Sequence, residues 1–141
     1  MASDISKIGS ALIDAFNAHD IEVWARQLAP GFSADYPNGV GLNAERARAY
    51  NQAFLTAFPD IEFHIRRKVV SEDHVVIEWT AKGTHTAPLV APTGETIPPT
   101  GRRITETAIL IAEVRNGRIV REATYWNLLS LLNQLGVLPQ R

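Results

Sequence analysis

The stretch "RRITETAILIAEVRNGRIVREATYWN", residues 102–127, decides the fold. Two runs of strand-forming residues, 102–114 and 118–127, flank the dipeptide Asn116-Gly117. Asn-Gly between two strand patterns favours a two-residue type I′ turn, because both residues tolerate a positive φ. The segment therefore predicts an antiparallel hairpin late in the chain.

Two more strands precede this hairpin. From residue 61 onward apolar residues recur at every second position, as in a half-buried strand. They are Ile61, Phe63 and Ile65 in one run and Val75, Ile77 and Trp79 in the next. Residues 72–74 predict a tight connection between these runs. Residues 87–101 are rich in proline, which cannot donate to a strand ladder, so we expect a loop or irregular edge there.

Helical patterns occupy most of the chain before residue 60. Apolar residues at positions 5, 8, 12 and 16 predict a first helix. Asp20 is the predicted N-cap of a short second helix that runs to Leu28 and is stopped by residues 29–31. A strand-to-loop segment, 32–41, leads to Asn43, the predicted N-cap of a third helix. A short apolar helix follows residue 127.

These elements predict a single α+β domain over residues 1–141. Its antiparallel sheet has about four long strands, and long strands in so small a sheet twist and curl. Helices that close the concave face of a curled sheet make a cone with an interior, where small molecules bind. Both faces of strands 103–114 and 118–127 carry apolar residues, so we expect a homodimer through the face that the helices leave open.

Composition excludes several classes of function. The formal net charge is −1 and the basic residues are scattered, so no nucleic-acid partner is expected. The chain has no cysteine and its four histidines are spread along it, so no metal site is expected. Residues 1–20 are unlike a signal peptide, and no apolar run approaches ~20 residues. We expect a cytoplasmic protein without a membrane span.

Six short motifs in the same order resemble those of the SnoaL-like polyketide cyclases. They are "LAPGFSADYPNG" (28–39), with Tyr36 where the family usually has His, "FPDIEF" (58–63), "GTHT" (83–86), "PPTGRRI" (98–104), "NGRIVREATYWN" (116–127) and "LLNQLGVLP" (131–139). The resemblance implies the cone-shaped fold of nuclear transport factor 2 and ketosteroid isomerase. It also implies an enzyme without cofactor or metal that binds a hydrophobic, aromatic or polyketide-like substrate. The family's best-known reaction is an aldol ring closure, in which an Asp at the end of the last strand moves the proton.

By this resemblance, Asn127 occupies the position of the family's catalytic Asp. An amide donates and accepts hydrogen bonds but cannot take a proton, so proton abstraction would fall to His85 or Glu106. Period 2 along the strand places Tyr125 and Ala123 on the same face as Asn127, which predicts that this face lines the cavity. The alternative is that Asn127 only caps the helix that follows it.

His85 and Glu106 have competing interpretations. His85 lies where a strand meets the proline-rich loop, near the expected cavity mouth. It is therefore either a base or oxyanion donor, or a loop residue that faces solvent. Glu106 lies in an otherwise apolar strand. Its carboxyl is therefore catalytic, or it forms an ion pair with a nearby arginine.

Four residues are candidates for ligand binding. Asp35 and Tyr36, at the end of the first strand segment, are expected to rim the pocket, although Asp35 could equally cap the turn. Trp79 and Tyr125 are expected as aromatic platforms or as core residues.

Three functions remain open at this point. The first is aldol cyclisation of a polyketide-like substrate. The second is hydroxylation of an aromatic polyketide by oxygen without a cofactor, as some cyclase-like relatives perform. The alternative from a different class is a non-catalytic small-molecule binding protein with the same cone.

Overall fold

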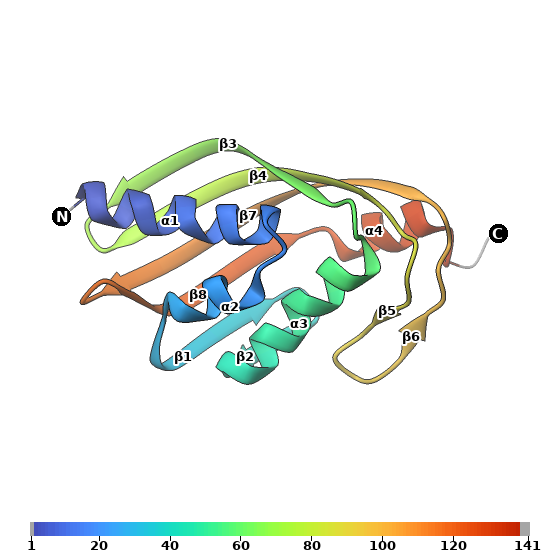
Figure 1. Cartoon of the computed structure of the whole chain (residues 1–141), viewed down its shortest axis with the longest axis horizontal. Helices are drawn as coiled ribbons and strands as arrows, with labels where there is room; N and C mark the ends of the chain where they lie inside the picture. The colour runs from blue at the N-terminus through green and yellow to red at the C-terminus, as the bar shows by residue number, and fades with distance from the viewer. Residues whose placement is uncertain (1, 139–141) are drawn as a thin grey trace.

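A curved, six-stranded sheet is the framework of the molecule (Figure 1). The computed structural model describes residues 2–138. The strands lie in the order β2-β1-β8-β7-β4-β3, and all neighbours are antiparallel except β1 and β8, which are parallel. Their bounds are β1 Leu28–Tyr36, β2 Gly39–Leu42, β3 Glu62–Ser71, β4 His74–Thr84, β7 Arg103–Arg115 and β8 Arg118–Trp126.

The helices pack on the sheet and enclose the core. Their bounds are α1 Ala2–Asn17, α2 Ile21–Arg26, α3 Ala44–Ala57 and α4 Leu128–Leu135. The first helix packs on β3 and β4, α3 packs on β1, and α4 packs on β7; Figure 1 shows α1, α2 and α3 on one side of the sheet. Fully buried Leu12, Trp24, Phe58, Ile77 and Leu110 fill the space between the layers. The predicted α+β fold with a curved, mainly antiparallel sheet is confirmed.

Both predicted hairpins are present. Asn116 and Gly117 connect β7 to β8 with φ angles of 52° and 75°, as a type I′ turn requires. Glu72 and Asp73 connect β3 to β4, because Ser71 pairs with His74.

A bulge in β8 reverses which residues face inward. Val114 of β7 pairs with Ile119, whereas Glu113 pairs with Arg121, so Val120 is an extra residue without a partner on β7. Ile119, before the bulge, is buried, and Glu122, three residues later, is buried too. In an uninterrupted strand these two side chains would point to opposite faces.

The structure corrects the prediction for residues 26–42. The second helix ends at Arg26 rather than Leu28, and residues 29–31 lie inside β1 instead of stopping the helix. The pairing of β1 with β8 jumps from Leu28 to Ser33, so Pro30 and Gly31 occupy an irregular stretch of β1. A proline is tolerated there because the irregular stretch does not need its missing N–H.

The proline-rich segment is more ordered than a loop. It contains two short strands, β5 (Leu89–Val90) and β6 (Thr96–Ile97), that pair as a small separate hairpin. Figure 1 shows this hairpin at one end of the sheet. None of the helices within residues 2–138 is long and apolar enough to cross a membrane.

Side-chain caps begin three of the helices. Asp20 accepts a hydrogen bond from the Val23 N–H (3.2 Å), and Asn43 accepts one from the Arg46 N–H (2.9 Å), as predicted. Asn127 caps α4 in the same way, because its Oδ1 accepts from the Ser130 N–H at 2.9 Å.

Replacing Asn127 by Ala should lower the free energy of unfolding by about 1 kcal/mol, because a backbone donor of α4 loses its partner. Urea denaturation measures this loss. Asn133→Ala, at an exposed position of the same helix, is the control and should cause no loss. Equal stability of Asn127→Ala and the unmodified protein would contradict the capping role.

The side of the sheet that faces away from the helices exposes apolar side chains. Val69, Ile109, Ile111 and Tyr125 have exposed fractions of 58%, 41%, 37% and 61%. The homodimer expected from the sequence stays a prediction, and this apolar face is the surface through which the two chains would pair. Light scattering should give twice the chain mass of 15.6 kDa. Ile109→Lys should reduce it to a single chain, whereas Val40→Lys should not. A monomer at micromolar concentration would contradict the prediction.

Candidate functional site

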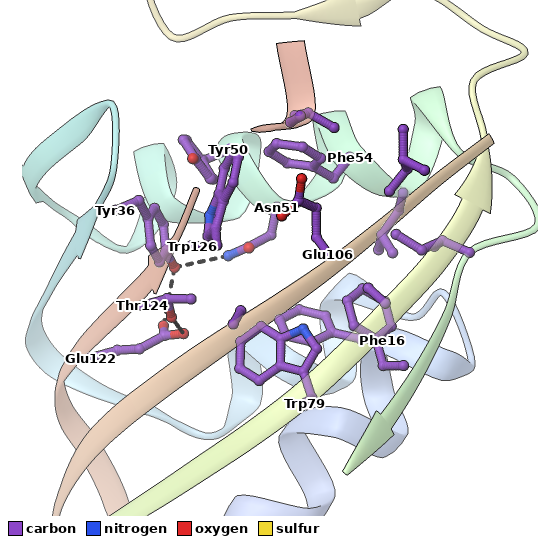
Figure 2. Close-up of a pocket in the computed structure, with 17 residues that line it drawn as sticks. Phe16, Tyr36, Tyr50, Asn51, Phe54, Trp79, Glu106, Glu122, Thr124 and Trp126 are labelled. Carbon is purple, nitrogen blue, oxygen red and sulfur yellow. Dashed lines mark hydrogen bonds between the residues drawn. The ribbon is translucent and has the colours of Figure 1, made fainter. Parts of the chain in front are cut away.

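A small cavity lies between the sheet and the helices (Figure 2). The centre of a water molecule can move through about 90 Å³ of it. Its walls come from α1, α3, β1, β3, β4, β7, β8 and α4 and are mainly aromatic and aliphatic. The polar side chains among them are those of Tyr36, Tyr50, Asn51, Glu106, Glu122 and Thr124.

Glu122 is the most deeply buried acid of the site. Only 2% of it is exposed. Tyr36 donates its hydroxyl proton to Oε2 at 3.1 Å, and Thr124 donates to Oε1 at 3.2 Å. The Asn51 Nδ2 group donates in turn to the Tyr36 hydroxyl at 2.9 Å. Figure 2 shows these four side chains joined in one hydrogen-bonded chain that ends on the carboxyl group.

Burial controls the charge of this carboxyl group. Removal from water raises the pKa of Glu122 to about 7, although the hydrogen bonds from Tyr36 and Thr124 lower it in part. Burial, followed by the charge of Glu122, raises the pKa of Tyr36 well above 10.0, so its phenol stays protonated. Glu122 therefore titrates near neutral pH while Tyr36 remains a hydrogen-bond donor.

Glu106 is a second carboxyl group on the cavity wall. Burial raises its pKa, and hydrogen bonds from Ser130 and Gln134 lower it in part. Gln134 of α4 donates to Oε1 at 2.8 Å. The same amide accepts from the Thr105 N–H (2.8 Å) and donates to the Thr105 carbonyl (3.1 Å). No arginine pairs with Glu106 among the described ion pairs, so the expected alternative of an ion pair is not what holds it.

Three of the residues singled out from the sequence line the cavity. They are Tyr36, Trp79 and Glu106. Tyr36 stacks on Tyr50 with a centroid distance of 4.4 Å, and Trp79 meets Phe63 edge to face at 6.3 Å. Tyr36 belongs to the inside of the cavity rather than to its rim.

Asn127 and Tyr125 lie outside the cavity, contrary to the expectation that their face of the strand lines it. Asn127 is exposed at the start of α4, and Tyr125 lies on the side of the sheet away from the helices. The reason is the bulge at Val120, which turns Glu122 and Thr124 inward and leaves Ala123 and Tyr125 on the outer face.

His85 is buried, but it does not line the cavity. Its Nδ1 accepts from the Thr100 N–H at 3.2 Å, and its ring packs on Phe58. Its backbone exchanges hydrogen bonds with Gly101 and Arg102. Burial lowers the pKa of the ring, so it is neutral at pH 7. Both alternatives considered for His85, a base at the mouth and a loop residue in solvent, are therefore replaced by a structural tie between β4 and residues 100–102.

Asp35 also serves the local structure. Its Oδ1 accepts from the Gly41 N–H at 2.8 Å, and its Oδ2 accepts from Arg121 at 3.2 Å. This is the turn-capping alternative. Among residues 2–138 no three His, Asp or Glu side chains gather into a metal-binding group.

Sequence reasoning did not single out Glu122. The signal that identified Glu106, an acid in an otherwise apolar strand, is weaker at Glu122, because its strand also carries Arg118 and Arg121 and its next neighbour on the same face is Thr124. The bulge that turns it inward leaves no mark in the period-2 pattern.

The raised pKa of Glu122 predicts a specific loss of stability with pH. The unfolded chain has an ordinary glutamate pKa near 4.5, so below that pH both states hold the proton and no penalty exists. As pH rises toward 7 the folded state keeps a proton that the unfolded state releases, and stability falls by about 2 to 3 kcal/mol between pH 5 and 8. Glu122→Gln should lack this fall. Equal pH dependence of the two proteins in urea denaturation would contradict the titration of Glu122.

Comparison with known proteins agrees with this fold. The family model for SnoaL-like polyketide cyclases matches residues 7–135. A search of curated proteins finds no matching relative. Among solved structures, AclR of Streptomyces galilaeus, a proposed hydroxylase, has a TM-score of 0.83 at 22% identity, and covers 99% of this chain and 100% of its own.

Two further structures extend the likeness. A proposed SnoaL-like polyketide cyclase of Jannaschia sp. CCS1 has a TM-score of 0.84 at 20% identity, with 98% of this chain and 95% of that chain covered. IdmH of Streptomyces antibioticus, a proposed polyketide cyclase, has a TM-score of 0.76 at 30% identity, with 94% and 99% covered. Since the matched residues 7–135 include the whole sheet and every residue of the cavity wall, the chain belongs to the SnoaL-like polyketide cyclase family.

Proposed function

We propose that the protein is an acid–base enzyme that acts on a polyketide-like substrate. Glu122 removes a proton from the carbon beside a carbonyl group and later returns it to the product. The observation that carries this proposal is the Glu122 carboxyl group, which is buried in a mainly apolar cavity and has a pKa of about 7. A general base works best when its pKa lies near the working pH, because both protonation states are then populated.

The proton balance of an aldol closure needs only this carboxyl group. The Glu122 carboxylate takes a proton from the substrate carbon, and the resulting enolate carbon bonds to a second carbonyl carbon of the same molecule. The new alkoxide then takes the proton back from the Glu122 carboxyl. Tyr36 and Thr124 hold the two carboxyl oxygens throughout, so the group keeps one orientation in both steps.

The cavity wall also indicates the charge of the substrate. Its titratable groups are the carboxyls Glu106 and Glu122 and two tyrosines, and it contains no Lys, Arg or His. A carboxylate or phosphate on the substrate would lie near like charges without a counter-charge. The substrate class is therefore an uncharged ketone or ester with flat rings, which the aromatic walls can stack against.

Hydroxylation is the second candidate, because AclR shares the fold and is a proposed hydroxylase. Deprotonation of the substrate is the first step there as well, so the role of Glu122 is the same. We place the cyclase first because IdmH, at 30% identity, is more similar in sequence. A binding protein without catalysis would keep the apolar cavity, but it gains nothing from a carboxyl group that destabilises the fold near neutral pH.

The test is hydrogen exchange at the acidic carbon of an aromatic β-keto ester in D₂O, followed by mass spectrometry. The unmodified protein should accelerate exchange, and Glu122→Gln should lose on the order of 10²-fold or more of that rate, because the amide cannot take the proton. Glu72→Gln, in the turn between β3 and β4, is the matched control and should exchange normally. With a substrate that carries two carbonyl arms, cyclisation gives an isomer of unchanged mass, and hydroxylation adds one oxygen atom. Full exchange by Glu122→Gln would exclude the proposed role.

A further inference from the structure

A second hollow lies outside the catalytic cavity. It is bounded by the β5–β6 hairpin on one side and by α3 and α4 on the other. The centre of a water molecule can move through about 350 Å³ of it, against about 90 Å³ in the inner cavity. The proposed proton transfer does not use this larger space, so its role is a separate question.

The two hollows share one wall. Tyr50, Phe54 and Leu131 line both of them. The Tyr50 hydroxyl donates to Asn38 at 2.6 Å, and its ring stacks on Tyr36. Phe54 meets Trp126 of the inner cavity edge to face at 5.5 Å. A flat molecule that occupies both hollows would therefore contact the rings of Tyr50 and Phe54 and the Leu131 side chain.

The outer hollow has the chemistry of an apolar binding surface. Leu89, Val90, Ala91 and Ile97 come from the hairpin, and Leu128 and Leu132 come from α4. The polar side chains are Asn38, Tyr50, Thr93 and Glu95, and the wall has no basic residue. Val90 is 49% exposed, which leaves apolar surface available to a ligand.

We propose that the outer hollow is a second subsite, which binds the non-reacting rings of an elongated, flat, uncharged substrate while its reacting end lies beside Glu122. The inference rests on the proposed function for the position of the reacting end. The small inner cavity accepts only the end that carries the carbonyl groups, and the larger outer hollow selects substrates by length. A substrate with one ring occupies the inner cavity alone.

The subsite is tested with two probes that share one reacting group, a one-ring and a three-ring aromatic β-keto ester. Binding is measured by quenching of tryptophan fluorescence, since Trp79 and Trp126 line the inner cavity, and deuterium exchange gives kcat and KM. The three-ring probe should bind on the order of tenfold more tightly, from the extra apolar area buried. Val90→Asp places a charge on the wall of the outer hollow, and Ala91→Phe reduces the volume of this hollow. Each should remove most of this advantage through KM, not kcat, because the outer rings bind equally before and during the reaction.

The matched control is Val40→Asp, an exposed valine on β2 that lines neither hollow. Val40→Asp should leave the affinity of both probes unchanged. The one-ring probe should also keep its affinity for Val90→Asp and Ala91→Phe. Equal affinity of the two probes in the unmodified protein, or an undiminished length advantage in both variants, would overturn the subsite. Loss of the one-ring probe together with the three-ring probe would overturn the separation of the two hollows. Absence of deuterium exchange with length-dependent binding intact would reject the proposed function and keep the subsite.

Discussion

The single extra residue in β8 is the constraint on which the site depends. Val120 has no partner on β7, so the strand changes face between Ile119 and Glu122. Without it, alternation from Ile119 would carry Arg121, Ala123 and Tyr125 toward the helices and Glu122 toward the outer face. The type I′ turn at Asn116 and Gly117 sets the pairing register of β7 and β8, and the bulge shifts this register by one residue. Together they set which side chains meet Tyr36 across the interior.

The three candidate residues that line the cavity are those whose direction depends on local geometry. Tyr36 is the last residue of β1, Trp79 belongs to a regular period-2 run in β4, and Glu106 lies in a long strand that pairs with β4 without interruption. Regular alternation then decides their direction. The hairpin turns and the caps at Asp20 and Asn43 are likewise short-range interactions of residue type with backbone, which the sequence displays directly.

The residues predicted incorrectly depend on irregular geometry or on distant partners. For Asn127 and Tyr125 the alternation after residue 121 is regular, but the resemblance assigns their face to the cavity, and the bulge at Val120 turns the opposite face inward. His85 is held by Thr100, which belongs to a segment whose path the proline pattern does not specify. Pro30 and Gly31 are typical of a helix end. They are tolerated within β1 only because the pairing with β8 is irregular there. In each case the deciding contact lies outside the local sequence window.

Gln134 of α4 also covers part of a sheet edge, through its hydrogen bonds to the backbone of Thr105 in β7. The partner strand β8 pairs with β7 only from Ala108 onward, so the first residues of β7 present a free edge on that side. Free edges of this kind recruit strands of other molecules and start aggregation. The Gln134 amide occupies both the N–H and the carbonyl of Thr105, as a neighbouring strand would. One side chain thus leaves Thr105 without a free backbone group on this edge for a strand of another molecule, and the same amide also donates to Glu106.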